Sequence, residues 1–392
     1  MKTLKRTWAD ISLDNLEYNY RSIRAHLPQG TKFLGVVKAD AYGHGAVPVS
    51  RALADLGAEY LAVSNLEEAV QIRRGEVRLP ILILGYTPAE YAANMIFLDI
   101  TQEVHSLEYA RELNEALAGT NYILNVHLKL DTGMTRIGFF AYDDERTLDE
   151  LRQVAQLPHL HIEGVFMHFC VADSRAEADV SFTKLQYKRF MDMLSAMAGV
   201  GIRPEIRHCC NSGATILYPE FALDMVRPGI ITYGNAPSDE LEGALSLRPM
   251  MSLHSMIAQV RTVPAGTDIS YGRLYQTKEE TRVAVLPIGY ADGLSRLLTG
   301  KASFYLQGHQ VPVIGRICMD MCMIDVSGVP EAKPGDVVTI FGYDDDGTLL
   351  PCERLARAQG TINYELLCQI SKRIPRICHR GAETSQILQY IV

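Results

Sequence analysis

The chain has 392 residues, enough for two domains with hydrophobic cores of their own. Its net charge of −8 at pH 7 gives no basic footprint for nucleic acid, and no apolar run approaches the ~20 residues that span a bilayer. We therefore expect no nucleic-acid partner and no membrane association.

The cysteines and the N-terminus favour a cytoplasmic protein. Residues 1–10 are basic but lack the hydrophobic centre of a signal peptide. Eight cysteines in so long a chain do not form a disulfide framework, so we expect reduced thiols. Cys209 and Cys210 are adjacent, and three residues separate Cys318 from Cys322. Because paired Cys-x-x-Cys or histidine ligands are absent at suitable spacing, we expect no metal site.

Short apolar strands alternate with amphipathic helices in the first part of the chain. Ser12 is a typical N-cap, and apolar residues at helical spacing predict a helix to about residue 27. Strands are predicted at 33–37, 60–63, 81–84, 97–100, 123–130, 162–168, 205–208 and 223–226, with helices between them, for example at 46–56, 104–118 and 182–197. Eight such alternations predict an α/β fold, a (β/α)8 TIM-type barrel over residues 12–243. No G-x-G-x-x-G follows the first strand, which argues against a dinucleotide-binding fold.

The pattern changes after Gly243, where helical periodicity fades and turn residues separate short strands. Strands are predicted at 256–263, 282–287, 304–306, 311–314, 323–326 and 337–341, and helices at 352–359 and 362–371. This pattern predicts a mainly-β C-terminal domain over residues 244–392. Whether residues 1–11 join that domain is left open.

Lys38 stands at the end of the first predicted barrel strand. Burial of an ammonium group is costly, so the pKa of this lysine should fall. A neutral lysine amine can attack a carbonyl, which makes Lys38 a candidate for Schiff-base chemistry. A lysine that merely extends from the barrel mouth into solvent is the ordinary alternative.

Polar residues also follow later barrel strands, where the catalytic groups of barrels lie. They are Arg136, His168, Asn211, Ser212 and Arg227. The Ser212 hydroxyl and the backbone of Gly229 and Ile230 suit a phosphate, because barrels often bind phosphate with the loops after strands seven and eight. Taken singly, each residue has an ordinary explanation as an ion pair, a packed histidine or a turn. Their recurrence at successive strand ends indicates one site.

Residues 36–45, Val-Val-Lys-Ala-Asp-Ala-Tyr-Gly-His-Gly, closely resemble the cofactor-lysine motif of the alanine racemases. These are enzymes of the barrel-fold type that use pyridoxal 5'-phosphate (PLP). The resemblance extends along nearly the whole chain. In the second domain, Ser-Tyr-Gly at 270–272 is similar to the motif of the family's catalytic tyrosine. Residues 315–320 are similar to its substrate-carboxylate loop, and 362–365 to its phosphate-contacting tyrosine segment.

The resemblance implies roles for residues of the barrel. Lys38 would hold PLP as an internal aldimine, Arg227 would face the pyridine nitrogen, and His168 would stack on the ring. Arg136 would meet the cofactor phenolic oxygen and lie near the substrate carboxylate. Lys129 matches a lysine that is often carbamylated to hold Arg136. The other cofactor contacts implied are Tyr42, Asn211, Ser212, Gly229, Ile230 and Tyr364.

The resemblance also implies roles for the second domain. Tyr271 would be the second catalytic base, beside Lys38, and Met319 would bind the substrate carboxylate. Both would come from the partner subunit, so a homodimer with shared active sites is implied. A free tyrosine has a pKa of about 10, so a basic role requires nearby cations or hydrogen bonds, which His168 and Arg227 could supply. An ordinary turn tyrosine is the alternative.

The function implied is that of an isomerase, an alanine racemase that interconverts L- and D-alanine and supplies D-alanine for peptidoglycan. Two bases on opposite faces of the bound amino acid would explain why both enantiomers react. A serine racemase of the same family is an alternative, although the membrane-bound serine enzymes carry a long transmembrane region and tend to lack a tyrosine at the Tyr364 position. A barrel decarboxylase usually places a carboxylate where this chain has Arg227. A non-catalytic PLP-binding protein usually lacks the second domain.

The chain departs from the family pattern in two places. Thr135 stands where a glycine is expected before Arg136. Cys209 and Cys210 precede Asn211, where other small residues are usual. Neither position carries an implied role, but both could reshape the pocket.

Overall fold

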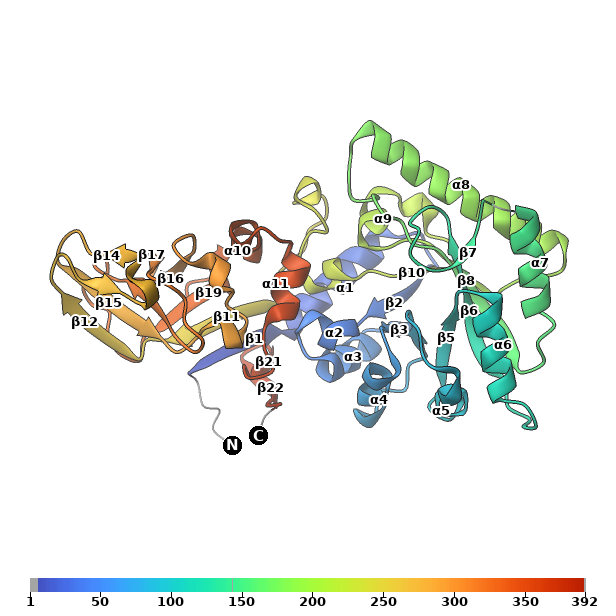
Figure 1. The fold of residues 1–392 in the computed structure, drawn as a ribbon, viewed down its shortest axis with the longest axis horizontal. Helices are drawn as coiled ribbons and strands as arrows, with labels where there is room; N and C mark the ends of the chain where they lie inside the picture. The colour runs from blue at the N-terminus through green and yellow to red at the C-terminus, as the bar shows by residue number, and fades with distance from the viewer. Residues whose placement is uncertain (1–5, 143, 391–392) are drawn as a thin grey trace. The chain divides into compact units, whose positions relative to one another are not determined.

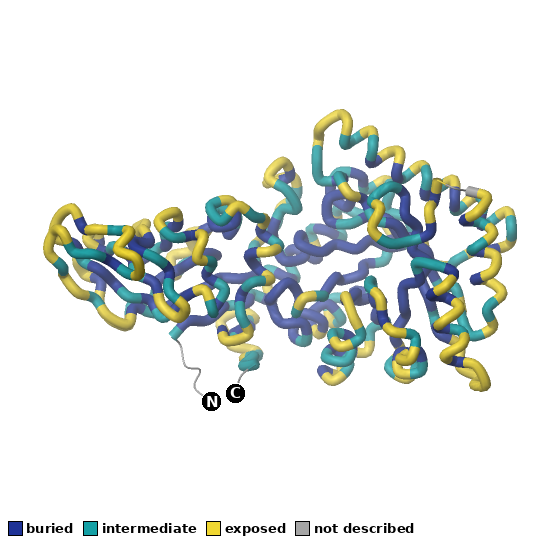
Figure 2. The backbone as a smooth tube through the Cα atoms, viewed as in Figure 1, coloured by how far each residue is buried: buried dark blue, intermediate teal, exposed yellow. Residues whose placement is uncertain are grey.

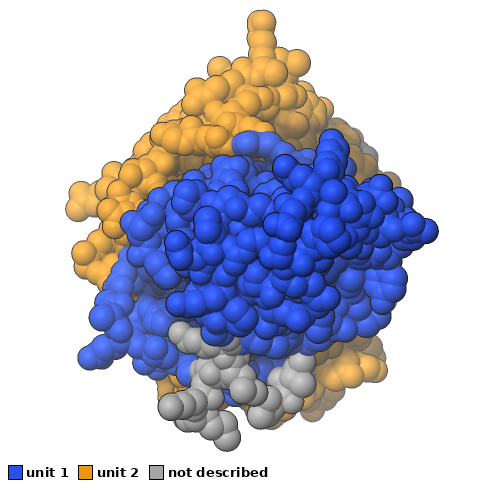
Figure 3. All heavy atoms as spheres, turned by 90° about the vertical axis from the view of Figure 1, so that its left-hand side faces the viewer, with its two compact units in different colours: residues 1–15, 42–45, 249–392 blue, residues 16–41, 46–248 orange. Residues whose placement is uncertain are grey.

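The computed structural model describes residues 6–142 and 144–390 (Figure 1). Buried residues lie mainly on the strands, and exposed residues lie mainly on helices and loops (Figure 2). The chain divides into two compact units, coloured separately in Figure 3. The barrel unit comprises Leu16–Ala41 and Ala46–Arg248, and the β unit comprises Met1–Asn15, Tyr42–Gly45 and Pro249–Val392.

Eight parallel strands in the described part of the barrel unit form a nearly closed barrel (Figure 1). Their order is β10 (Met225–Val226), β2 (Lys32–Val36), β3 (Tyr60–Val63), β4 (Ile81–Ile83), β5 (Ile100–Val104), β6 (Leu124–Asp131), β8 (Leu160–Phe166) and β9 (Ile206–His208). The pairing of β10 with β2 brings the last strand beside the first. Strands of such a barrel are covered on both faces, which explains their continuous apolar runs. The predicted barrel is confirmed.

Helices and short strands complete the barrel unit. They are α1 (Leu13–His26), which begins in the β unit, α2 (Lys38–Tyr42), which ends there, α3 (Ala46–Asp55), α4 (Leu66–Arg74), η1 (Ala89–Tyr91), α5 (Ala92–Phe97), α6 (Leu107–Ala116), β7 (Phe139–Phe140), α7 (Asp144–Val154), α8 (Glu177–Gly199), α9 (Ser212–Leu217), η2 (Pro219–Phe221), η3 (Ile230–Tyr233) and η4 (Asp239–Leu241). Side-chain caps begin several of them; for example, Asn65 accepts a hydrogen bond from the Glu68 amide and Ser106 accepts one from the Tyr109 amide. No helix among the described residues is long and apolar enough to cross a membrane.

One predicted barrel strand was wrong in its position. Helix α5 ends at Phe97 and strand β5 begins at Ile100, so the predicted strand 97–100 spans the connection between them. Phe97 is 69% exposed, whereas Ile100 is buried. The apolar residues of a helix end and of a strand start therefore read as one strand in the sequence.

The β unit is built on one long mixed sheet (Figure 1). Its order is β12 (Gln259–Val263), β15 (Thr281–Leu286), β18 (Cys322–Asp325), β17 (His309–Ile314), β16 (Ser303–Leu306), β19 (Val337–Tyr343), β11 (Met251–Met256), β1 (Thr7–Ser12), β21 (Arg376–Arg380) and β22 (Glu383–Leu388). The remaining elements are β13 (Asp268–Ile269), η5 (Tyr271–Arg273), β14 (Tyr275–Gln276), η6 (Tyr290–Asp292), η7 (Arg296–Leu298), β20 (Leu349–Leu350), α10 (Cys352–Gln359) and α11 (Asn363–Gln369). The mainly-β second domain is confirmed.

The sheet differs from the prediction at two of its strands. The predicted strand 256–263 contains the last residue of β11 and the whole of β12, two strands that belong to different parts of the sheet. The strand β1 was not predicted, yet it lies between β11 and β21, antiparallel to the first and parallel to the second. Its Trp8, Ala9 and Ile11 are buried, and the strand has a neighbour on each side in the sheet.

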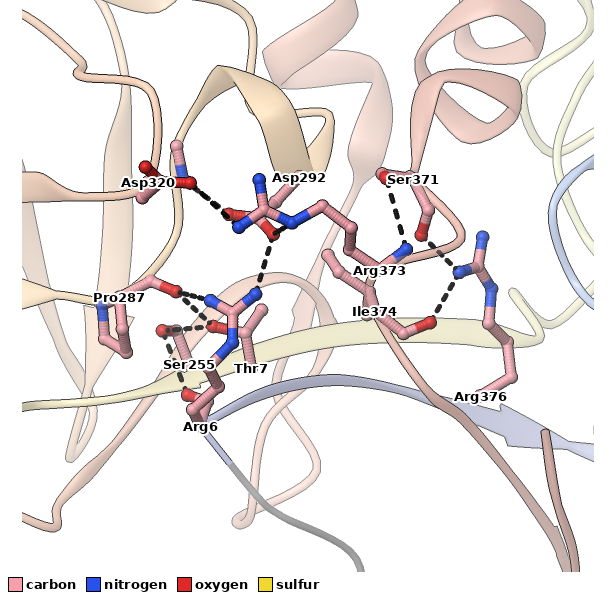
Figure 4. Close-up of polar contacts among 11 residues, drawn as sticks. Arg6, Thr7, Ser255, Pro287, Asp292, Asp320, Ser371, Arg373, Ile374 and Arg376 are labelled. Carbon is pink, nitrogen blue, oxygen red and sulfur yellow. Dashed lines mark hydrogen bonds and ion pairs between the residues drawn. The ribbon is translucent and has the colours of Figure 1, made fainter. Parts of the chain in front are cut away.

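A buried carboxylate ties three loops of the β unit together (Figure 4). The Asp292 side chain is fully buried and accepts from Arg6 at 2.9 Å, while Arg373 lies 3.6 Å away. Arg373 also pairs with Asp320 at 2.8 Å. The loop that contains Asp320 is further held because the Ala291 amide donates to the carbonyl of Met319. These contacts fix the loop that carries Met319.

We predict that Arg6→Ala lowers the free energy of unfolding by about 2 kcal/mol, because a buried carboxylate then loses its closest cation. The urea midpoint of unfolding measures this change. The matched control is Arg273→Ala, which removes an ion pair with Asp268 from a side chain that is 77% exposed. Such a surface pair should contribute less than about 1 kcal/mol. Equal midpoints for the two variants would contradict the prediction.

Candidate active site

The chain makes a left-handed turn immediately after β2. Within α2, φ is 52° at Ala39, 54° at Asp40 and 54° at Ala41, in the left-handed region. Each L-residue in a left-handed helix costs roughly 1–2 kcal/mol, so consecutive residues of this kind are rare. Strain of this sort gathers at functional sites, where the surrounding structure must hold it. The turn begins at Lys38, at the C-terminal end of a barrel strand.

Two carboxylates hold this turn in place. Glu68, on α4, accepts hydrogen bonds from the backbone amides of Ala39 and Ser64, each at 2.7 Å. Asp40 accepts from the amide of Ala46 at 2.8 Å. These bonds fix the backbone on both sides of the turn, and they therefore fix the direction in which the chain leaves Lys38.

Arg227 follows β10 and is buried among polar atoms of neighbouring strand ends. Its Nη1 lies 3.0 Å from Nδ1 of His208, and its Nη2 lies 3.4 Å from Nδ1 of His168. Nη2 also donates to the carbonyls of Met167 at 2.8 Å and Cys209 at 3.1 Å. Burial lowers the pKa of Arg227 to about 10, which still leaves a cation at neutral pH.

The His168 imidazole follows β8 and is neutral at physiological pH. Burial lowers its pKa well below the ordinary value, and the nearby positive charge of Arg227 lowers it further. The charges of Lys129, Arg136 and Lys38 act in the same direction. The structure thus brings four of the predicted barrel residues, Lys38, Lys129, Arg136 and Arg227, within electrostatic reach of a fifth, His168.

Lys129 is buried at the end of β6. Burial lowers its pKa to about 7, and the charges of Arg227 and Arg136 add to this effect. Its Nζ donates to the carbonyl of Leu130 at 3.2 Å and lies 5.1 Å from the centre of the Phe166 ring. The amine is therefore partly uncharged at neutral pH.

The loop before Arg136 explains why a glycine is expected at position 135. Thr135 has φ of 55°, in the left-handed region that a β-branched residue rarely adopts. The Asp131 carboxylate closes this loop by accepting from the amides of Gly133, Thr135 and Arg136. The loop thus keeps its left-handed backbone with threonine in place, and Arg136 is exposed.

The predicted phosphate-binding residues come together at the ends of β9 and β10. The Ser212 hydroxyl accepts from the amide of Gly229 at 2.9 Å, and Ile230 begins η3 directly afterwards. Asn211 is the N-cap of α9, where its side chain accepts from the Ala214 amide. Cys209 and Cys210, which precede Asn211 in the sequence, are both buried.

Four predicted site residues belong to the β unit. The rings of Tyr42 and Tyr364 lie 6.0 Å apart, and burial raises the pKa of Tyr42. Tyr271 is 69% exposed and Met319 is 53% exposed. The β unit therefore presents Tyr271 and Met319 to solvent.

Reasoning from the sequence missed three polar residues that are linked to Arg227 by a line of hydrogen bonds. His127, Glu163 and His208 lie within predicted strands but were not singled out. Their signal is a polar side chain within an apolar run, as in Val-His-Leu at 126–128. Such a residue is either exposed or part of a buried network, and periodicity alone does not distinguish the two.

Comparison with known proteins agrees with this architecture. Residues 11–237 match the family model of the alanine racemase N-terminal domain, and residues 250–378 match that of the C-terminal domain. The chain is 46% identical over 370 residues to the alanine racemase of Desulfovibrio desulfuricans, covering 94% of this chain and 97% of that protein.

Solved structures are also similar. The alanine racemase of Clostridium difficile 630 is 40% identical, with a TM-score of 0.93 over the whole length of both chains. The alanine racemase of Bacillus anthracis with bound L-Ala-P is 34% identical, with a TM-score of 0.93 over 100% of this chain and 99% of that one. The family models, the relatives and the fold thus agree with the motif at Lys38, and the chain belongs to the alanine racemase family of isomerases.

Proposed function

We propose that this protein interconverts L- and D-alanine with PLP as its cofactor. The observation that carries the proposal is the cluster at the strand ends of the barrel. A strained turn begins there at Lys38, whose charge acts on the neutral His168, and His168 lies 3.4 Å from the buried Arg227. The relative from Bacillus anthracis holds L-Ala-P, an alanine-like compound by its name, which supports an alanine substrate.

The barrel residues fit PLP. Lys38 supplies the amine for covalent attachment, and Arg227 supplies a buried donor for the pyridine nitrogen. Ser212 offers a hydroxyl and Ile230 a backbone amide to the phosphate, next to Gly229, whose amide donates to the Ser212 hydroxyl. His168 covers the ring, and the remaining proposed contacts are Tyr42, Asn211 and Tyr364. When bound, PLP withdraws electrons from the substrate and so acidifies its Cα–H bond.

The chain's own residues would then handle the proton. Lys38 and Tyr271 act as the two bases on opposite faces of the substrate, one taking the α-proton and the other returning one. Arg136 and the loop at Met319 hold the substrate carboxylate. Arg227 can only donate hydrogen bonds, so it disfavours a proton on the pyridine nitrogen and limits electron withdrawal. This limit favours return of the proton to Cα.

Deuterium exchange at Cα in D₂O with added PLP, followed by NMR, tests the reaction. We predict exchange with inversion on L-alanine, much faster than on L-serine. Tyr271→Phe should lower turnover by roughly 10²–10⁴-fold in at least one direction, the usual size of general acid–base catalysis, with PLP absorbance retained. Tyr305→Phe, in β16 of the same unit, is the matched control and should not differ from the unaltered protein.

The other outcomes discriminate the alternatives. Faster exchange on serine would identify a serine racemase with the same mechanism. PLP absorbance without exchange on either amino acid would identify a binding protein. Unchanged racemisation in Tyr271→Phe would remove Tyr271 from the mechanism. We also propose that the protein acts in the cytoplasm and supplies D-alanine for peptidoglycan. If so, its gene should restore growth of a D-alanine-auxotrophic strain without added D-alanine.

We propose that the active unit is a homodimer in which Tyr271 and Met319 of one subunit complete the site of the other. The support is the exposure of large apolar residues in the β unit. Tyr271 is 69%, Leu274 63%, Met319 53% and Met321 50% exposed. Exposed apolar residues of this kind, when they gather, mark protein–protein contacts.

Hybrid dimers of two inactive variants test the shared site. In a dimer of one Lys38→Met chain and one Tyr271→Phe chain, a shared arrangement leaves one site with both bases intact. We predict about half of the normal activity per hybrid dimer, because one of the two symmetric sites is whole. Dimers purified through two different affinity tags measure this. An inactive hybrid would show that each site is built within a single chain.

We also propose that Lys129 is carbamylated. The neutral amine would add CO₂, forming an N–C bond and releasing one proton, and the resulting anion would lie near Arg136 and Arg227. The fit rests on the lowered pKa of this buried lysine, since a protonated amine has no lone pair for the reaction.

Carbon-13 NMR with ¹³C-bicarbonate tests the modification. We predict a carbamate resonance that grows as pH rises through about 7, because the neutral fraction of Lys129 rises there. Lys129→Met should abolish this resonance, whereas Lys184→Met, at an exposed lysine of α8, should keep it. A signal that survives Lys129→Met, or no signal at any pH, would contradict the proposal.

The domain limits 12–243 and 244–392 stay proposals, and the gap between the matched family models, from 238 to 249, is compatible with them. We propose that residues 6–11 belong with the second domain, since β1 lies within the sheet of the β unit, whereas residues 1–5 lie outside the described part of the chain.

A further inference from the structure

A line of hydrogen bonds runs through the interior of the barrel from Arg227 to a carboxylate. Arg227 Nη1 lies 3.0 Å from His208 Nδ1. His208 Nε2 lies 2.8 Å from His127 Nδ1, and His127 Nε2 lies 3.1 Å from Glu163 Oε2. Both imidazoles are fully buried. The function proposed above uses only the first member of this line.

The direction of every bond in the line follows from its two ends. A guanidinium can only donate, so Nδ1 of His208 must accept and cannot carry a proton. The proton of a neutral His208 is then on Nε2, which must donate to Nδ1 of His127. By the same reasoning His127 carries its proton on Nε2 and donates it to Glu163. Each histidine is therefore held in one tautomer.

At the far end of this line, hydrogen-bond donors around the Glu163 carboxylate favour its ionised form. Tyr60 donates to its Oε1 at 2.9 Å, and Thr101 donates to its Oε2 at 3.2 Å. Burial raises the pKa of this carboxyl, but the hydrogen bonds donated by His127, Tyr60 and Thr101 outweigh burial, and the pKa is lowered overall. Three donors converge on one carboxylate, which is the arrangement that favours the anion.

The backbone is shaped to seat His127. The pairing of β6 with β8 shifts register between Val126 and His127, an irregularity that can redirect a side chain. The residue opposite His127 is Gly164, where a Cβ would lie 2.5 Å from the imidazole ring. Only a glycine leaves room for the ring, so the backbone of β8 is shaped to accommodate the His127 imidazole.

Arg227 needs such a partner. Within the described part of the chain it makes no ion pair with a carboxylate, and its side-chain hydrogen bonds go to two imidazoles and backbone carbonyls. A buried cation without a counter-ion is costly. A carboxylate connected through polarised imidazoles supplies the missing negative charge without occupying the side of Arg227 that faces the site.

We propose that Glu163 is a positioning residue for Arg227, which it orients and balances through the fixed tautomers of His127 and His208. The part of the proposal that concerns turnover rests on the proposed function. The part that concerns tautomers does not, and it can be tested in the full-length protein with or without cofactor.

The first measurement is long-range ¹H–¹⁵N NMR of the full-length protein labelled at histidine, with the two resonances assigned by their loss in His127→Asn and His208→Asn. We expect both histidines as neutral Nε2–H tautomers at pH 7. A protonated ring, or an Nδ1–H tautomer at either residue, would overturn the proposal. This outcome requires no change at Glu163, so it does not depend on the folding of a Glu163 variant.

The second measurement repeats the spectra and the kinetics on Glu163→Gln. The amide removes the charge and offers a donor to His127, so we expect mixed tautomers at His127 and shifted resonances at His208. We expect kcat lower by roughly 10–100-fold, the effect of losing a charge-assisted hydrogen bond, with KM changed less than about threefold. The matched control is Glu205→Gln, whose side chain is 73% exposed and whose backbone amide donates to the carbonyl of Glu163.

Tyr60→Phe keeps the carboxylate and removes one donor, so the tautomers should survive. Unchanged tautomers in Glu163→Gln, with kinetics equal to those of Glu205→Gln, would overturn the positioning role. If the unaltered protein racemised nothing yet showed the expected tautomers and their loss in Glu163→Gln, the proposed function would fail while the link from Glu163 to Arg227 would stand.

Discussion

A guanidinium buried at the end of the barrel is the constraint on which the rest of the site depends. Arg227 keeps its charge although burial lowers its pKa to about 10, so the surrounding structure must satisfy a cation that is removed from water. It does so with carbonyls of neighbouring strand ends and with lone pairs of two imidazoles. Because these acceptors must stay unprotonated, one cation dictates the protonation of its neighbours.

The same charge shapes the chemistry nearby. It contributes to the lowered pKa of His168 and to that of Lys129, which falls to about 7. A barrel mouth crowded with cations favours anions such as a phosphate, a carboxylate or a carbamate. That preference matches the chemistry of a cofactor phosphate and an amino-acid substrate, both of which the family resemblance implied.

Rigid supports surround this cluster. The left-handed turn after Lys38 is held by Glu68 and Asp40 on either side. In the β unit, the buried Asp292 and the Arg373–Asp320 pair fix the loop that carries Met319. Sites hold their geometry when such outer contacts lock the residues that act. The line from Arg227 to Glu163 extends this principle through the inside of the barrel.

The sequence alone determined the barrel, the mainly-β second domain, the family and the candidate residues, because strand alternation and contiguous motifs are local properties of a chain. The roles of those residues remain proposals. Only the tertiary structure decided the place of β1, whose partners β11 and β21 lie more than 200 residues away in sequence. It also separated the end of α5 from β5, which share one apolar run. The tautomer-fixing line through His127, His208 and Glu163 was hidden for the same reason. A polar residue inside a strand acquires a partner only when distant strands come into register, and no local pattern records that pairing.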